Sequence, residues 1–198
     1  PIPYIKLKDN DKVVNISNKQ GLSVFITTHN GFGLRYNIEE IPIVGPRGSG
    51  VKAISLKNDI VVSGCVIDNE EYVSLITTKN TGKRIKLSEF ELISRARKGV
   101  QVIRDVKTNP YCIKKAFVVP IRHNLGLKFK EDIEIIKLSE LPIVDRYSTG
   151  TQLSKHDILD CFIESEMVNP DQIKKEEKDI KEEVTLESVD ERMMTIDD

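Results

Sequence analysis

Arginine and lysine residues in three similar loops are the side chains of this sequence best suited to bind a partner. We name the loops by residue range: the first basic loop is 43–50 (IVGPRGSG), the second is 92–99 (LISRARKG) and the third is 143–150 (IVDRYSTG). Their closing glycines are 49 and then 51 residues apart, which indicates an internal repeat. Because these side chains bind phosphate, cations presented from equivalent places of a repeat predict one extended surface for a polyanion.

Two sets of cations are candidates for this surface. The first set consists of the loop residues Arg47, Arg95, Arg97, Lys98 and Arg146. The second set belongs to the strand predicted after an asparagine-containing turn, and consists of Arg35, Lys83, Arg84, Lys86 and Lys128. Each phosphate that a cation neutralises releases counterions, so we expect salt-sensitive binding with little base selectivity. The alternative is that these charges only keep surface loops soluble.

Nucleotide binding and acid–base catalysis are poorly supported by the sequence. The glycines of the first basic loop have the spacing of a phosphate-binding loop, but Val51 stands where that motif needs lysine, and a strand is predicted to follow. His29 and His123 are expected in corresponding, exposed turns. No serine–histidine–acid set or carboxylate pair can be assigned, so we expect no catalytic residue.

Metal binding is equally poorly supported. The pairs His156 with Asp160, and Asp157 with Cys161, have helical spacing but offer too few ligands for a metal ion. The three cysteines are far apart and form no Cys-x-x-Cys pair, which argues against a zinc ribbon or a disulfide framework. A reducing cytoplasm fits this cysteine usage best.

Short β-strands must position the basic loops. Segments rich in β-branched residues and separated by turn residues predict strands at 12–16, 22–28, 32–36, 51–56, 60–66 and 72–78. Residues 82–85 then match 33–36 at a spacing of 49. In the third copy we predict a strand at 111–119, a turn at 122–124 and a counterpart of 82–85 at 126–129, followed by about seven inserted residues.

This pattern predicts an all-β fold. A unit of four short strands in about 49 residues has the size of a propeller-type blade, and such blades bury their faces by packing in series. We predict one domain of about three blades at 1–153, with repeats at about 12–55, 56–104 and 105–153. In residues 154–198 we expect a short helix capped by Ser154 and then a flexible acidic tail.

Charge is divided unevenly along the chain. Of 31 acidic and 30 basic residues, residues 164–198 contain 13 and 5, which leaves 18 and 25 in residues 1–163. A basic body suits a polyanion, and the acidic tail is either a solvated end or an intramolecular competitor for the basic surface. No apolar run approaches the roughly 20 residues of a membrane span. Because the chain begins at Pro1 within a predicted strand, we expect a fragment of a longer protein.

Four segments carry a resemblance to a known family: 31–36, 45–54, 88–90 and 95–100. They resemble the C-terminal domain of the DNA-cleaving A subunits of bacterial type IIA topoisomerases. The resemblance implies a β-pinwheel, a closed or spiral ring of four-stranded blades whose basic rim binds and bends double-stranded DNA without sequence preference. It also implies that catalysis, the nucleophilic tyrosine, ATP and Mg²⁺ belong to other parts of an ATP-dependent enzyme, and that this domain holds no cofactor.

The resemblance further implies a heterotetramer, in which missing N-terminal parts contact a second A subunit and a B subunit. This assembly is expected in the cytoplasm, associated with the nucleoid and not with a membrane. Residues 104–110 and 145–150 favour the topoisomerase IV branch, which relaxes and unlinks DNA. The Gln-Arg-Arg-Gly-Gly-Lys-Gly box of gyrase is absent from this sequence. The family usually has five or six blades, however, and the box could belong to a blade that this sequence lacks. Gyrase therefore remains an alternative. The alternative from another class is a propeller-like protein-interaction scaffold.

Overall fold

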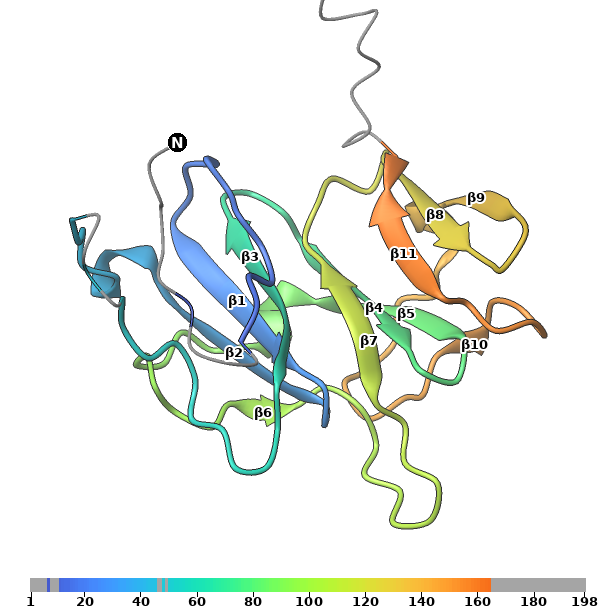
Figure 1. The fold of residues 1–198 in the computed structure, drawn as a ribbon, viewed down its shortest axis with the longest axis horizontal. Helices are drawn as coiled ribbons and strands as arrows, with labels where there is room; N and C mark the ends of the chain where they lie inside the picture. The colour runs from blue at the N-terminus through green and yellow to red at the C-terminus, as the bar shows by residue number, and fades with distance from the viewer. Residues whose placement is uncertain (1–6, 8–10, 46–47, 49, 165–198) are drawn as a thin grey trace, which may run out of the picture. The chain divides into compact units, whose positions relative to one another are not determined.

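Three antiparallel β-sheets form the part of the chain that the computed structural model describes, which is residue 7 and residues 11–45, 48 and 50–164 (Figure 1). The first sheet has the order β3-β1-β2-β6 and contains β1 (Ser23–Thr28), β2 (Phe32–Asn37), β3 (Val61–Ile67) and β6 (Val100–Gln101). The second has the order β7-β4-β5-β10 and contains β4 (Tyr72–Thr77), β5 (Thr81–Lys86), β7 (Ile113–Phe117) and β10 (Thr151–Gln152). The third has the order β11-β8-β9 and contains β8 (Asn124–Lys128), β9 (Ile133–Lys137) and β11 (Asp160–Ile163).

The strands of the first two sheets are interleaved along the sequence. Each is built on a hairpin, β1–β2 or β4–β5, but its outer strands come from later in the chain. Strand β3 precedes β4 and pairs with β1, and strand β6 follows β5 and pairs with β2. Strands β7 and β10 flank the second hairpin in the same way. The all-β class and the four-stranded blade are therefore confirmed, with each blade assembled from non-consecutive strands.

The strand register confirms the repeat of 49 residues between the first two hairpins. Ser23 pairs with Asn37 in the first, and Tyr72 pairs with Lys86 in the second. A short 3₁₀ turn follows the second strand of every hairpin, at Ile38–Glu40, Leu87–Glu89 and Leu138–Glu140. The hairpin strand and the turn after it therefore form one recurring unit.

The third repeat differs from its predicted alignment. Residues 126–129 resemble 82–85 in sequence, but β8 is the first strand of its hairpin and corresponds to β4. Strand β9 precedes the 3₁₀ turn and corresponds to β5, so Lys137 is the counterpart of Lys86. The hairpin at described residues 124–137 contains no seven-residue insertion, and the prediction was wrong there. A similar four-residue string was matched, whereas pairing across the sheet fixes the register.

Three predicted elements take other forms. Residues 12–16 and 51–56 lie outside the strands, although their apolar alternation is typical of one. The helix predicted after Ser154 is also wrong, because strand β11 occupies the end of that segment. Apolar side chains at alternate positions, Cys161 and Ile163, are buried there, which is the periodicity of a strand. The acidic tail lies outside the described residues.

Cross-strand pairs of complementary size fill the sheets. In the first sheet Phe25 pairs with Cys65, and in the second the small Ser74 pairs with Phe117. In the third, Gly126 lies directly under the ring of Phe162, where a β-carbon would overlap the ring. At this equivalent position each sheet has one aromatic ring, which comes either from the first strand of the hairpin or from the strand beside it. The small partner leaves room for the ring, so the side chains pack closely without strain.

Candidate nucleic-acid interface

The second and third basic loops occupy equivalent places on the first two sheets. The second loop begins with a parallel bridge between Arg35 and Leu92, and the third begins with a parallel bridge between Arg84 and Ile143. The second loop ends on a glycine at φ +81° packed against Gly33, and the third ends on one at φ +79° packed against Gly82. A β-carbon on either closing glycine would overlap the opposing main chain. The repeat of closing glycines therefore reflects a backbone contact that only glycine permits.

The second basic loop presents two of its three cations to solvent. Arg97 and Lys98 are exposed, and the Lys98 ammonium lies 4.2 Å from the centroid of the Phe32 ring. Arg95 is half-buried, and its Nη1 donates a hydrogen bond to the main-chain carbonyl of Lys52. Arg97 and Lys98 are therefore the residues of this loop that a phosphate can reach, while Arg95 helps to hold the loop.

Arg146 is the cation of the third basic loop, and it is half-buried. Its Nη1 donates to the main-chain oxygen of Gln101 at 3.3 Å, and its Nε lies 3.8 Å from the Glu89 carboxylate. The preceding Asp145 accepts main-chain hydrogen bonds from Tyr147 at 2.7 Å and Ser148 at 3.0 Å, which shape a tight turn. The turn fixes the place from which Arg146 projects.

Two cations of the second set are buried in the second sheet. Lys83 has no exposed surface and Arg84 only 6%. Arg84 donates from Nε to the carbonyl of Leu141 at 2.8 Å and from Nη2 to that of Ser139 at 2.9 Å. All of β5 except its last residue is buried, so a phosphate cannot reach either side chain. The structure thus argues against Lys83 and Arg84 as DNA contacts and gives them internal roles.

The other candidates fall into three environments. Arg35 is the counterpart of Arg84, is half-buried, and donates to the hydroxyl of Ser23 and the carbonyl of Leu87. Lys86 and Lys128 are exposed at the ends of their strands. Arg47 lies outside the described residues. The repeated arginine therefore holds the 3₁₀ turn of the next repeat, and of the second set only the two lysines at strand ends are freely accessible.

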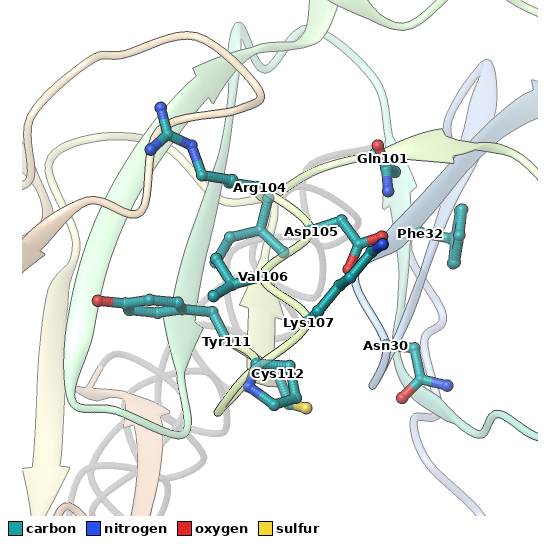
Figure 2. Close-up of a pocket in the computed structure, with 11 residues that line it drawn as sticks. Asn30, Phe32, Gln101, Arg104, Asp105, Val106, Lys107, Tyr111 and Cys112 are labelled. Carbon is teal, nitrogen blue, oxygen red and sulfur yellow. The ribbon is translucent and has the colours of Figure 1, made fainter.

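A pocket of about 310 Å³ lies beside the start of β2 and the connection from β6 to β7. Residues from segment 101–112 and from the turn and start of the first hairpin's second strand line it, and Figure 2 shows Phe32 and Asn30 on one side, Tyr111 on the other and Lys107 between them. Arg104 and Lys107 are exposed cations of this lining. The sequence pattern did not single them out, because they belong to the connection between repeats and have no counterpart at a fixed spacing.

Cations of both basic loops contact the pocket lining. Lys98 lies over Phe32, and Arg146 donates to Gln101. Lys79, from the turn of the second hairpin, lies 3.9 Å from the centroid of Tyr111. Together with Arg104 and Lys107, these three cations surround one concave surface. Their field favours an anion with several phosphates over a neutral ligand.

Known proteins of one family share this architecture. A family model described as "DNA gyrase C-terminal domain, beta-propeller" matches residues 2–18, 23–63 and 71–110. A crystal structure of the C-terminal domain of DNA topoisomerase IV aligns with a TM-score of 0.75 and 33% sequence identity, over 81% of this chain and 52% of that chain. The chain belongs to this family of topoisomerase C-terminal domains.

Two relatives place the topoisomerase C-terminal domain within longer proteins. The A subunit of DNA topoisomerase 4 from Bacillus subtilis is 37% identical over 150 residues, which are 74% of this chain and 19% of that protein. The protein of the same name from Streptococcus pneumoniae is 30% identical over 191 residues, 86% of this chain and 23% of that protein. The chain spans about a fifth of the length of these relatives. A DNA gyrase A C-terminal domain has the same fold, with a TM-score of 0.70 at 17% identity.

Two histidines and one cysteine of this topoisomerase C-terminal domain are partly or fully enclosed by the fold. His29 Nδ1 lies 3.2 Å from the carbonyl oxygen of Ile113, and His123 Nδ1 lies 3.0 Å from that of Pro120. Both rings are half-buried and occupy different places in their repeats, contrary to the expectation of equivalent exposed turns.

Burial raises the pKa of the Cys161 thiol to about 12, so it is not a nucleophile. Within the described ranges, no three metal-binding side chains cluster, and no helix has the length and apolar character to cross a bilayer.

Proposed function

We propose that this domain binds double-stranded DNA, as an accessory part of the A subunit of a topoisomerase IV. The observation that carries the proposal is the equivalent placement of two basic loops on successive sheets, with Lys98 and Arg146 both contacting residues that line one pocket. The choice of DNA as the bound polyanion is based on the relatives, which are subunits of DNA topoisomerases.

The proposed contacts are to phosphates. Arg97, Lys98 and Arg146 are the loop cations that we assign to the DNA backbone, and Arg104 and Lys107 extend the surface at the pocket. Lysine and arginine read the charge of the backbone and not the edges of the bases, so binding is sequence-tolerant and weakens steeply with salt. A duplex that contacts successive sheets follows the turn from one sheet to the next, which favours a bent path.

The wider role concerns the whole enzyme. We propose that the domain guides the DNA segment handled during ATP-dependent relaxation and unlinking by a type II topoisomerase. Catalysis, ATP and Mg²⁺ are assigned to other parts of that enzyme, as are contacts with a second A subunit and with a B subunit in a heterotetramer. Such an enzyme acts on the bacterial nucleoid in the cytoplasm. The support is that the relatives are A subunits whose length far exceeds this chain.

Gyrase is the second candidate, because the matching family model and one structural neighbour are gyrase domains. A DNA-wrapping assay on the full-length protein separates the two. Positive chiral wrapping would assign the chain to gyrase, and binding without such wrapping would favour topoisomerase IV.

Fluorescence anisotropy with two unrelated duplexes tests DNA binding itself. We expect similar affinities for both duplexes, and a fall of more than tenfold between about 50 and 200 mM salt. The double variant Arg97→Ala/Lys98→Ala should bind more weakly. The matched control Lys130→Ala/Lys137→Ala removes two exposed lysines from the third sheet and should bind nearly as the native domain does. No binding at low salt would favour the protein-interaction scaffold.

A further inference from the structure

We infer that Lys83 is a positioning residue for DNA binding, because its ammonium group holds the main chain of the third basic loop in the shape that presents Arg146. The inference rests on the proposed function, which assigns that loop to DNA. Lys83 itself has no exposed surface and therefore touches no ligand. Its effect on binding would pass through the loop.

The side-chain hydrogen bonds of Lys83 go to this loop. Its Nζ donates to the carbonyl oxygens of Asp145 at 3.3 Å, Arg146 at 2.8 Å and Ser148 at 2.5 Å. An ammonium group has three donors, and three carbonyls surround this one. The acceptors span four consecutive residues, so a single side chain closes the whole turn from inside.

The equivalent position of the first sheet shows that the fold does not require a cation there. Leu34 is the counterpart of Lys83 at a spacing of 49, and it is buried as well. The second basic loop, which packs beside it, is held by main-chain hydrogen bonds: Ala96 N–H donates to Ala53 at 2.8 Å, and Ser55 N–H donates to Arg97 at 2.9 Å. Both loops are held at their start by the same main-chain bond, from Ile93 to Arg35 at 3.1 Å and from Val144 to Arg84 at 3.0 Å, but their central residues are fastened by different means.

The charges around Lys83 explain how an ammonium is kept inside the sheet. Burial disfavours the charged form and lowers the pKa of Lys83, and Asp145 of the third loop and Glu89 of the 3₁₀ turn offset part of this effect. Glu89 also lies 3.8 Å from Nε of Arg146. Lys83 and Arg146 are therefore linked twice, through the carbonyl of Arg146 and through a shared acidic neighbour. Removing the ammonium should release the turn and with it the arginine.

Amide hydrogen exchange on the folded chain tests the fastening directly. Lys83→Met keeps a long unbranched side chain and removes its donors, and Lys83→Leu copies the first sheet. We expect the amides of Tyr147, Ser148 and Gly150 to exchange about tenfold faster in both variants, while strands β4 and β5 stay protected. The control Lys137→Met removes one exposed lysine from β9 and should leave these amides unchanged. Unchanged exchange in both Lys83 variants would overturn the inference.

A double-mutant cycle on DNA affinity tests the link to function. Arg146→Ala and Lys83→Met should each weaken binding by up to about tenfold, and the combined variant should bind hardly less than Arg146→Ala alone. Additive losses would show that Lys83 does not act through Arg146 and would overturn the positioning role. If the native domain fails to bind DNA, the proposed function falls, and with it the role in binding; the exchange experiment still reports whether Lys83 fastens the loop.

Discussion

Gly150 lies against Gly82 so closely that a β-carbon on Gly150 would be 2.5 Å from the Gly82 carbonyl oxygen. Gly99 and Gly33 form the same contact on the preceding sheet. One glycine of each pair ends a basic loop, and the other lies in the second strand of a hairpin. These pairs dock the loops on the strands, and they connect the periodicity of the sequence with the placement of its cations.

Alanine at Gly150 should destabilise the domain by about 2 kcal/mol or more, because the methyl group overlaps the main chain and an L-residue is strained at φ +79°. Urea unfolding measures the loss. Gly50→Ala is the matched control, since φ is +72° there but no described atom lies within 4 Å of the added carbon. It should cost only about 1 kcal/mol. Equal losses in the two variants would contradict the importance of the close contact.

Buried and exposed arginines should separate stability from binding. Arg84→Met leaves the carbonyls of Ser139 and Leu141 without their donors and should cost about 2 kcal/mol of unfolding free energy. Arg97→Met should change stability by less than about 0.5 kcal/mol and weaken DNA binding. Urea titration and anisotropy on the same two proteins give both quantities. An Arg97 variant that unfolds as easily as the Arg84 variant would refute this assignment.

Stability should depend on pH through Lys83. Desolvation by burial lowers the pKa of this ammonium from 10.5 to about 8. Between these two values the unfolded chain binds more protons than the folded domain, so the free energy of unfolding gained from this residue rises with pH. Relative to Lys83→Met, the native domain should gain up to about 3 kcal/mol from pH 7 to pH 10. A difference that stays constant, or falls, would show that the charge is not penalised in the folded state.

Arg104 and Lys107 should contribute to DNA binding although neither belongs to a repeated loop. Changing both to alanine should reduce the slope of log affinity against log salt by about 2, one unit for each lost phosphate contact. Anisotropy titrations at several salt concentrations give the slope. Lys130→Ala/Lys137→Ala removes the same charge from the third sheet and serves as the control. If both double variants lower the slope equally, the effect is one of net charge and not of this pocket.

The sequence was most informative where one residue type serves one purpose. The closing glycines could be found from their spacing, because only glycine tolerates both the positive φ and the contact with the opposing main chain. The matches between residues 33–36 and 82–85 were correct for a similar reason, since the hairpin register is the same in both repeats. The family resemblance carried the step from a basic surface to DNA.

The sequence was least informative about which side chains point into the fold and which distant segments they contact. Lys83 and Arg84 are adjacent cations, and nothing local shows that both are enclosed by loops from 55 to 65 residues further along. The alternation at 51–56 is typical of a strand, but its main chain bonds to the second basic loop instead of to a sheet. Arg104 and Lys107 had no repeat to reveal them. In each case the deciding contact is distant in sequence.

The interleaving of strands from successive sheets has a consequence for synthesis on the ribosome. The sheet that starts at Ser23 is not complete until Gln101 has left the exit tunnel, and by then the hairpin of the next sheet has already emerged. That second sheet in turn waits for Gln152. Neither of the first two sheets is complete before the hairpin of the next sheet has been made. Nascent chains of this domain therefore carry an open sheet edge throughout elongation, and pairing over such long separations is slow.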